Sequence, residues 1–527
     1  MQMNTFRQSV LMLLVCLSCG SSSVPPSGSG RRATEPGRLM YCDFDIYRLG
    51  VSGNNITVSE AANPRKDAVN SSKRCGVAVS QGAAYGGVAV TLSRTMDFTL
   101  NAPVIKAKIL APRAGVQICC QIKRKANGDA PECPHLNVYA TTTKAGEWED
   151  YTFDFSGQAP VDNWYQKIVF YFDPGGNVSG EAWYFDSIEG PDDDLSSISL
   201  FQRPFSHPYI EADPAYPWRS VCIAAGYVFG PGDTPDGNWY YYVRGSSGDM
   251  SSGRSEHQTI GLLTQKAEDF DPLGKWDDYK GNPVIDVGAS GEWDDWRILG
   301  PAPCVMPDGS VQMFYKGRPY GDKSNKLCGL AISRDWYRFE KQSDGPVFEG
   351  NPACVIFHDG KYYYYQGCWL RIFTDPMKIG EAEVVKCLEA GDGPANFDRM
   401  CVYGNRVFRL KGVDKWIMTY YGSSSHIDFP DRAHAAISDD LAHWTKVDNE
   451  KPLFTRGPHG AWDQGGIWLP MIFEHKGKLY MYYEAWGREG FVADRDKDYF
   501  RPGISQVGAA VCDKKDFIEW LGLSPNE

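Results

Sequence analysis

Carboxylate side chains recur in this sequence at one kind of position, shortly before an apolar run that ends in a Gly turn. Two of them share a phrase, because a Trp-Asp pair stands seven residues ahead of a proline at Asp294 and again at Asp463. Asp295, Glu349 and Asp398 occupy comparable positions. Cleavage of a glycosidic bond requires two carboxyl groups, one to protonate the leaving oxygen and one to activate water or attack the sugar. These five residues are therefore candidates for that chemistry.

The candidate carboxylates belong to a repeated unit that occurs five times between Pro204 and the C-terminus. Each unit has an apolar strand, a Gly turn, an aromatic-rich strand and a third strand, as in residues 352–365 and 406–421. Repeats of about 40 to 60 residues with three or four short strands are typical of propeller blades, and no long stretch has a helical period. The sequence therefore predicts a five-bladed β-propeller over residues 204–527. Carboxylates before the first strands of different blades are expected to meet in its funnel, where crowding raises the pKa of one.

Three of these residues also fit a purely structural role. The Trp-Asp phrase is repeated, and repetition favours a task such as capping a blade turn for Asp294 and Asp463. Asp398 stands next to Arg399, so it is either half of a structural ion pair or a carboxylate that orients the acid. Both interpretations stay open at this point.

Residues 39–190 predict a separate all-β module. Short alternating runs are separated by Gly, Pro and Asn turns, at residues 87–92, 116–122 and 167–172. Residues 148–155 and 182–188 resemble strands of the jelly-roll carbohydrate-binding modules that accompany polysaccharide-degrading enzymes. We therefore predict a carbohydrate-binding β-sandwich, or alternatively a sandwich that only supports the next domain. Residues 191–203 are predicted to be the linker.

Residues 1–19 are typical of a lipoprotein signal peptide. The apolar core at residues 10–15 is too short to span a bilayer, and Leu17-Ser18-Cys19-Gly20 resembles the bacterial lipoprotein cleavage box, with Cys19 as the lipidated residue. Cys16 departs from that motif, so plain secretion is the alternative. Residues 20–38 are rich in Ser, Pro and Gly and predict a flexible linker. We expect a bacterial lipoprotein of the cell envelope, periplasmic or outer-membrane anchored, or an extracellular protein, with membrane attachment only through a lipid anchor.

Composition limits the partners. The 527 residues carry a formal net charge of −12 and are 13% aromatic. Binding of nucleic acid needs clustered Lys and Arg, which this balance disfavours, whereas aromatic rings stack on sugar faces. An anionic glycan remains compatible, because a local basic pocket can lie in an acidic protein.

The cysteines are expected to have two roles. Those in predicted strands are expected to be buried. One or two disulfides are compatible with export, and they would be formed by Cys42, Cys75, Cys119, Cys120 and Cys133.

One stretch resembles a known family. Glu349-Gly350-Asn351-Pro352, followed by Gly360-Lys361-Tyr362-Tyr363, is similar to the Glu-Gly-Pro and Gly-x-Tyr-Tyr phrases of glycoside hydrolase family 43. With its five units, the chain resembles the superfamily of five-bladed propeller glycosidases, which includes families 43, 32, 62, 117 and 130. Asn351 departs from the family pattern, and the phrase lies in the third unit where that family has it in the fourth.

The resemblance implies a role for each carboxylate. Glu349 would be the general acid, Asp295 or Asp294 the base, and Asp398 or Asp463 the group that tunes and orients the acid, with inversion at the sugar. No cofactor is required. His459 resembles the last-blade His that lies beside a central cation in family 43, so a bound Ca²⁺ is compatible, although no metal-loop spacing supports it.

Aromatic and basic residues around these positions suit sugar rings and hydroxyls. Rings stack on sugar C–H faces and guanidinium groups bind vicinal hydroxyls or acidic groups. The candidates for substrate binding are Arg219, Trp296, Arg297, Trp369, His426, His459, Trp462 and Trp486. The sequence thus predicts an exported glycoside hydrolase acting on a poly- or oligosaccharide. The alternatives are a non-catalytic glycan-binding propeller and a phosphorylase that holds phosphate with an Arg/Lys/His cluster.

Overall fold

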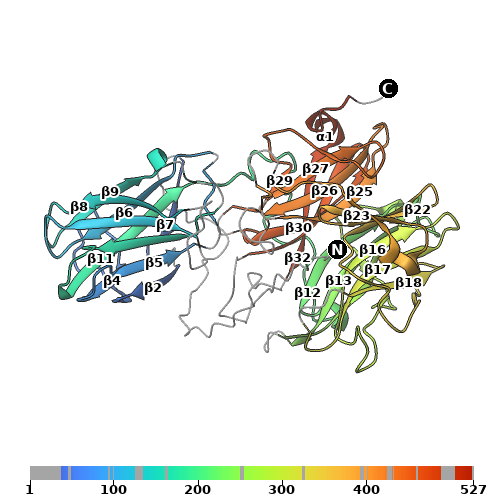
Figure 1. Ribbon diagram of the computed structural model, residues 1–527, viewed down its shortest axis with the longest axis horizontal. Coiled ribbons are helices and arrows are strands. Elements are labelled where there is room, and N and C mark those ends of the chain that lie inside the picture. The colour runs from blue at the N-terminus through green and yellow to red at the C-terminus, as the bar shows by residue number, and fades with distance from the viewer. Residues whose placement is uncertain are drawn as a thin grey trace, which may run out of the picture.

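The computed structural model describes residues 37–524 apart from internal gaps. The gaps are residues 46–48, 93–94, 99, 125–133, 159, 161–163, 250–253, 323–326, 392–396, 400, 424–429, 431, 459–460 and 488–504. Cys19, Cys133, His426 and His459 therefore lie outside the described residues. The predicted all-β class is confirmed: a sandwich is followed by a propeller, and the described residues form a single α-helix, α1 (Lys514–Trp520) (Figure 1). None of the described helices has the length and apolar character needed to cross a bilayer.

Two antiparallel sheets form the N-terminal sandwich. The first sheet contains β1 (Arg38–Cys42), β3 (Ile56–Ala62), β4 (Arg74–Gln81), β6 (Val104–Leu110), β9 (Trp148–Asp154) and β11 (Ser179–Pro191). The second contains β2 (Gly50–Asn54), β5 (Gly87–Thr91), β7 (Gln117–Lys123), β8 (Leu136–Thr141) and β10 (Lys167–Phe172). Alternation in β9 buries Tyr151 and Phe153 and exposes the residues between and after them. Phe153 then meets Phe170 of the other sheet at 5.9 Å between ring centroids, so the two apolar faces form one core.

Five blades of antiparallel strands form the propeller, and a parallel pair, Gln258 with Arg297, joins blades 1 and 2 into one sheet. Blade 1 has β12 (Cys222–Phe229), β13 (Trp239–Asp249), β14 (Arg254–Gln265) and β15 (Asp277–Asp278). Blade 2 has β16 (Arg297–Val305), β17 (Val311–Arg318), β18 (Leu327–Ser333), β19 (Glu340–Lys341) and β20 (Phe348–Glu349). Blade 3 has β21 (Cys354–His358), β22 (Lys361–Gln366), β23 (Trp369–Phe373) and β24 (Glu383–Lys386). Blade 4 has β25 (Cys401–Arg409), β26 (Trp416–Ser423), β27 (Arg432–Ser438), β28 (Thr445–Lys446) and β29 (Phe454–Thr455), and blade 5 has β30 (Gly466–His475), β31 (Lys478–Trp486) and β32 (Gln506–Asp513).

The ring is closed by a segment that precedes blade 1. The first strands β12, β16, β21, β25 and β30 each contact the next around the ring, and β30 contacts β12. Gln202 pairs with Val511 and Ile210 pairs with Val507, so the chain before blade 1 adds to the outer edge of blade 5. This pairing covers an edge that would otherwise expose backbone donors and acceptors. An ion pair between Arg244 of blade 1 and Glu484 of blade 5, 2.8 Å from Nη2 to Oε1, also crosses the seam.

Side chains fill the propeller axis below one end. Arg406 of blade 4 donates from Nη1 to the carbonyl oxygen of Ala353 in blade 3 at 2.6 Å, and its guanidinium lies 4.3 Å from the ring centre of Tyr227 in blade 1. The Tyr227 hydroxyl donates to the same carbonyl. Contacts among blades 1, 3 and 4, which lie on different sides of the ring, place these groups near the axis. We call the end of the propeller where the first strands begin, at Cys222, Arg297, Cys354, Cys401 and Gly466, the mouth.

Bulges bend the inner strands near the mouth. The pairing register shifts in β12, β16, β25 and β30, between their first and last residues. Gly300 and Gly404 lie in two of these bulges with φ of 59° and 65°, a region that glycine reaches without strain. Such bulges redirect the side chains on either side of them. They therefore help to aim the first residues of the inner strands toward the axis.

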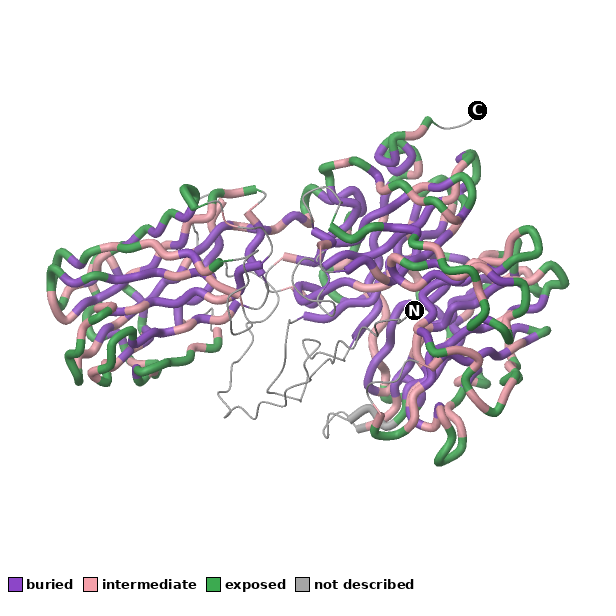
Figure 2. Tube along the Cα trace, in the orientation of Figure 1, coloured by how far each residue is buried: buried purple, intermediate pink, exposed green. Residues whose placement is uncertain are grey.

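The sandwich packs against the propeller beside the mouth. Arg432, the first residue of β27, forms a buried ion pair of 2.8 Å with Asp97 of the sandwich. Arg456 donates to the carbonyl oxygen of Thr95 at 3.1 Å, and Arg399 stacks 4.4 Å from the ring centre of Trp164. Figures 1 and 2 show the two domains side by side, each with buried strands at its centre.

Candidate functional site

Asp294 lies in a buried cluster within blade 2. Its carboxylate accepts a hydrogen bond of 3.1 Å from the hydroxyl of Tyr315 and pairs with Lys341 Nζ at 2.8 Å. The preceding Trp293 stacks on the ring of Tyr315, with centroids 5.8 Å apart. A Cβ at Gly317 would lie 2.1 Å from the Trp293 ring, so that position must be glycine for the indole to approach the strand. The cluster joins the start of the blade to its second and fourth strands.

Blades 4 and 5 repeat this cluster. Asp398 accepts from the hydroxyl of Tyr420 at 3.5 Å and pairs with Lys446 at 2.6 Å. Asp463 accepts from the hydroxyl of Tyr483 at 2.9 Å and pairs with Arg203 Nε at 2.6 Å. The cation again comes from the outermost strand position, because Arg203 lies in the segment that completes blade 5. The partners that Asp294, Asp398 and Asp463 bind lie within their own blades, so the structure does not bring these carboxylates together.

Blade 1 has the same cluster with its charges exchanged. Trp218 and Arg219 stand where blades 2, 4 and 5 have an aromatic residue and Asp, and Asp278 of β15 stands where these blades have the cation. Arg219 Nη2 pairs with Asp278 at 2.9 Å, and the Trp218 indole donates to the same carboxylate at 3.1 Å. Arg219, a predicted sugar ligand, is therefore held in a buried ion pair. Trp462 is likewise occupied, because it stacks on Tyr483 in the blade 5 cluster.

The remaining sequence-derived carboxylates have different surroundings. Glu349 is exposed and pairs through its backbone with Leu327 at the mouth end of β18; its carboxylate makes no ion pair or hydrogen bond to another described residue. Asp295 accepts from the backbone N–H groups of Gly291 and Tyr320, both at 2.7 Å. Asp295 thus joins two loops, whereas Glu349 is unengaged.

Buried polar atoms without hydrogen-bond partners gather at the mouth. Ser246 and Gln258 lie at the mouth ends of β13 and β14, and Arg297 begins β16. On blade 5, the indoles of Trp468 and Trp486 meet at 4.9 Å. Among the described residues, the buried atoms with no partner here are Arg244 Nε, Ser246 Oγ, Gln258 Oε1, Arg297 Nε, Trp468 Nε1, Glu484 Oε2 and Trp486 Nε1. Unsatisfied buried polar atoms are uncommon in native proteins, so a group of donors and acceptors at one end of a propeller indicates a polar ligand.

Glu484 is the buried carboxylate of this group. Its Oε1 accepts from Arg244 Nη2 and from the hydroxyl of Ser505, while Oε2 has no partner among the described residues. Arg244 Nη2 also lies 3.8 Å from the thiol of Cys222, at the start of the first inner strand. Glu484 therefore presents one free oxygen beside the axis. From the sequence, Glu484 is a lesser catalytic candidate at the end of an aromatic strand, and nothing there links Glu484 with Arg244.

Arg297 is the predicted sugar ligand whose surroundings are most unusual. Its guanidinium lies 3.8 Å from the ring centre of Trp296 and makes no ion pair or hydrogen bond with any described residue. Burial, together with the like charges of Arg318 and Arg244, lowers the pKa of Arg297 to about 10. Trp296 is thus occupied as a support for Arg297. Trp369, the first residue of β23, is 51% exposed and free to stack on a ligand.

A second candidate surface lies on the outer face of the sandwich sheet that contains β5, β10, β7 and β8. Tyr171, Cys119 and Tyr139 stand opposite one another in a row across this face. Tyr171 lies flat over Gly87, where a Cβ would come within 2.7 Å of the ring, and Tyr85 meets its edge at 6.4 Å. Tyr85 and Tyr139 are 61% and 56% exposed. Exposed Tyr rings in a row form a surface on which sugar rings can stack.

Amide side chains line the next row of the same face. Gln121 donates from Nε2 to Asn137 Oδ1 at 2.8 Å, and its own Oε1 accepts from the Tyr171 hydroxyl at 3.3 Å. These contacts fix the orientation of the amides beside the rings. Aromatic and amide groups together are suited to the faces and hydroxyls of a glycan chain.

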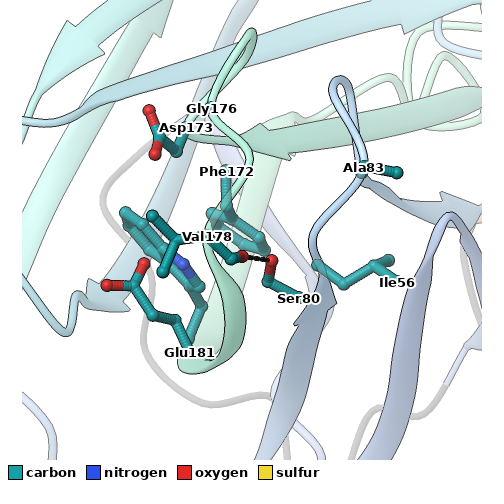
Figure 3. A pocket seen from close by; sticks show the side chains of 10 residues that line it. Ile56, Ser80, Ala83, Phe172, Asp173, Gly176, Val178 and Glu181 are labelled. Atoms are coloured by element: carbon teal, nitrogen blue, oxygen red, sulfur yellow. Dashed lines mark hydrogen bonds between the residues drawn. The ribbon is translucent and has the colours of Figure 1, made fainter.

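A small hollow at one end of the sandwich is less suited to a ligand. Figure 3 shows Asp173 and Glu181 on one side of it and Ile56 and Ala83 on the other. Both carboxylates pair with Arg113, at 2.8 and 2.5 Å, and Ser80 donates to the carbonyl oxygen of Val178. The polar groups are therefore satisfied within the protein.

Cysteine and metal expectations have different outcomes. Cys42, Cys75, Cys119 and Cys120 are free and buried in the structure, so the predicted disulfides do not form among them. Cys133 lies outside the described residues. No group of three or more His, Cys, Asp or Glu within the described ranges is arranged to hold a metal ion.

Comparisons with known proteins give only distant likenesses. No family model and no curated protein matches the sequence. A glycosyl hydrolase from Bacteroides ovatus is 17% identical, covers 62% of this chain and 97% of its own, and has a TM-score of 0.42. A putative glycoside hydrolase from Parabacteroides distasonis is 16% identical, with 61% and 98% coverage and a TM-score of 0.41. A family 11 carbohydrate-binding module from Clostridium thermocellum is 18% identical over 30% of this chain and 97% of its own, with a TM-score of 0.23.

Proposed function

We propose that this protein binds a carbohydrate at the mouth of its propeller and hydrolyses a glycosidic bond there. The observation that carries the proposal is the group of unpaired polar atoms at the mouth, which mixes donors with acceptors beside two indole rings. A buried polar atom without a partner costs about 1 to 3 kcal/mol. A sugar hydroxyl both donates and accepts, so a polyhydroxyl ligand can satisfy both kinds of atom at once.

Two carboxyl groups are needed for the reaction, and two residues near the mouth are the best candidates. Glu484, ion-paired with Arg244, has one free oxygen with which to activate water or stabilise the positive charge that develops on the sugar. Glu349 remains our candidate for the proton donor, since it lies at the mouth end of blade 2 and makes no ion pair with a described residue. Asp294, Asp398 and Asp463 would instead hold their blades together.

Hydrolysis is tested by the release of reducing sugar from a panel of poly- and oligosaccharides in phosphate-free buffer. We expect product from the wild type, a loss of at least about a hundredfold in Glu484→Gln and Glu349→Gln, and full activity in Glu474→Gln. Glu474 pairs with Lys514 near the end of β30 that is opposite the mouth, so it controls for loss of a carboxylate from blade 5, the blade that contains Glu484. No product on any glycan, with binding retained, would contradict hydrolysis and favour a glycan-binding propeller.

A phosphorylase is the second candidate function, because guanidinium groups do gather at the mouth. Arg244, Arg297 and Arg318 affect one another electrostatically there, and such a cluster can hold phosphate. Repeating the assay with and without inorganic phosphate distinguishes the two reactions. Product that appears only with phosphate, as a sugar phosphate, would replace hydrolysis by phosphorolysis.

We also propose that the sandwich holds a glycan chain on the Tyr85, Tyr171 and Tyr139 surface, and that the protein is exported and lipidated at Cys19. The glycan-binding proposal rests on the exposed Tyr row. It requires that Tyr139→Ala weaken the retention of the protein on an insoluble polysaccharide.

The lipidation proposal rests on the sequence at residues 10–20. It requires that labelled palmitate be incorporated into the wild type and not into Cys19→Ser.

A further inference from the structure

We propose that the sugar bound at the mouth is anionic, a uronate or a sulfated sugar, and that Arg297 binds its charged group. This inference rests on the proposed carbohydrate-binding function of the mouth. Arg297 begins the inner strand β16 and stands in register with Arg318 on one side and Gln258 on the other. Because β16 is the inner strand of blade 2, Arg297 lies beside the axis and not on the outer edge of the blade.

Arg297 lacks the anion that other guanidinium groups of this propeller possess. Arg203 pairs with Asp463, Arg219 with Asp278 and Arg244 with Glu484. Arg297 forms no ion pair with a described residue, and its Nε is buried without a hydrogen-bond partner. Among the described residues, the group that supports its guanidinium is the indole of Trp296, whose ring centre lies 3.8 Å away. A partly buried charge without a partner is unfavourable. An anionic ligand would provide the negative charge that the Arg297 guanidinium lacks.

The electrostatics of the mouth favour a single negative charge. Arg244 is already neutralised by Glu484, whose carboxylate lies on the same seam. A phosphate dianion would meet one unpaired guanidinium and repulsion from Glu484, whereas a carboxylate or sulfate ester carries one charge. A planar guanidinium can also bind a carboxylate through two parallel hydrogen bonds. The indoles of Trp468 and Trp486 and the polar atoms of Ser246 and Gln258 can bind the rest of the sugar ring.

The test compares the binding of matched glycans to the full-length protein by calorimetry. The ligands are a uronate-containing oligosaccharide, the same oligosaccharide with its carboxyl groups reduced to alcohols, a sulfated oligosaccharide, a neutral oligosaccharide and inorganic phosphate. The variants are Arg297→Gln and, as a matched control, Arg371→Gln. Arg371 lies in blade 3 with its guanidinium 4.5 Å from the ring centre of Phe348, so it too is a guanidinium supported by an aromatic ring, but on β23.

We expect the wild type to prefer one anionic glycan over its neutral counterpart. Arg297→Gln should lose about 10- to 100-fold in affinity for that glycan, the range expected for a hydrogen bond to a charged group, and Arg371→Gln should lose none. The affinity of the wild type should also fall as salt is added. The uronate and sulfate arms show which anion is bound.

Other outcomes would overturn the inference in distinct ways. Equal affinity for the acidic and the carboxyl-reduced glycan, unchanged in Arg297→Gln, would contradict the anionic sugar and leave the proposed carbohydrate site intact. Binding of inorganic phosphate alone through Arg297 would replace the sugar by phosphate. No binding of any glycan to a folded wild type would reject the proposed function and this inference together.

Discussion

The candidate carboxylates and arginines differ in whether their charged groups have partners within the protein. Asp294, Asp398 and Asp463 precede inner strands, as a catalytic carboxylate would, but each accepts from a Tyr hydroxyl and pairs with a Lys or Arg of its own blade or of the segment completing it. Arg219 is held by Asp278 in the same way. At the mouth, Arg297 and Glu484 have groups left unpaired. The first set therefore has a structural arrangement, and the second is suited to a ligand.

This contrast predicts that Asp463→Ala destabilises the propeller. Asp463 is fully buried and Arg203 is 13% exposed, so the variant leaves a buried guanidinium and the Tyr483 hydroxyl without their acceptor. Removal of one partner of a buried ion pair costs about 3 to 5 kcal/mol. Chemical denaturation should show that loss. The matched control is Asp439→Ala, which breaks the exposed pair with Lys415 and should change stability by less than about 1 kcal/mol. Unchanged stability with lost turnover would return Asp463 to the catalytic candidates.

At the scale of elements, blade 4 contains a titratable group that couples its folding to pH. His434 on β27 donates a hydrogen bond from Nε2 to the carbonyl oxygen of Val447 at 2.9 Å, and the ring of Trp520 packs against the imidazole with ring centroids 5.1 Å apart. Burial, together with the positive charges of Lys446 and Arg432, lowers the pKa of His434 to about 4. The folded protein therefore keeps this imidazole neutral where an unfolded chain would protonate it.

The consequence is a loss of stability in mild acid. The pKa of His434 lies below the unfolded value, so its contribution is complete above about pH 6.5 and is lost as the pH falls from there toward 4. A shift of this size corresponds to about 3 kcal/mol at pH 4 relative to pH 7. The free energy of unfolding, measured by denaturant titration between pH 4.5 and 7.5, should fall less steeply toward acid in His434→Gln than in the wild type. Parallel curves for the two proteins would contradict this assignment.

The blades and the sandwich could be predicted from the sequence because each element is encoded locally. Strand alternation, Gly turns and aromatic runs recur in every unit, and the Trp-Asp phrase shows two copies of the blade cluster at Asp294 and Asp463. The copy at Asp398 has Phe in place of Trp, and the copy at Arg219 has its charges exchanged, so no phrase connects them. Their partner cations or carboxylate lie on outer strands far along the chain. Only the fold pairs such groups.

The mouth was harder to predict for the same physical reason. Arg244, Ser246 and Gln258 stand on the second and third strands of blade 1, and Glu484 stands on the second strand of blade 5. Sequence reasoning placed chemistry just before first strands, where Arg297 was found. Residues on the second and third strands also lie at the mouth, but which of them do so depends on the strand register, which cannot be derived from the sequence. Glu484 was a lesser candidate from its place at the end of an aromatic-rich strand, and a search for polar residues at the ends of all such strands would have added Arg244.

At the scale of the whole molecule, the two domains are fixed to each other beside the mouth. Asp97 and Arg432 form a buried ion pair, Arg456 binds the Thr95 carbonyl oxygen, and Arg399 stacks on Trp164. These contacts lie around the start of blade 4 and the end of its outer strand. The proposed glycan surface at Tyr139 and the mouth are thus held at a constant separation, which lets one chain bind both if it is long enough.

Weakening this contact should affect long substrates more than short ones. In the double variant Asp97→Ala with Arg399→Ala, the sandwich loses its buried ion pair and its cation–π contact with the propeller. Free movement of the sandwich lowers the effective concentration of a tethered glycan at the mouth. We expect turnover of a polymer to fall several-fold, up to roughly tenfold, while turnover of a short oligosaccharide stays the same, and small-angle scattering should show a larger radius of gyration. Asp150→Ala, which breaks an exposed pair with Lys108 inside the sandwich, is the control.

Two outcomes would contradict this prediction. An equal loss of turnover on both substrates would indicate damage to the mouth itself. An unchanged radius of gyration with normal turnover would show that other contacts hold the two domains together.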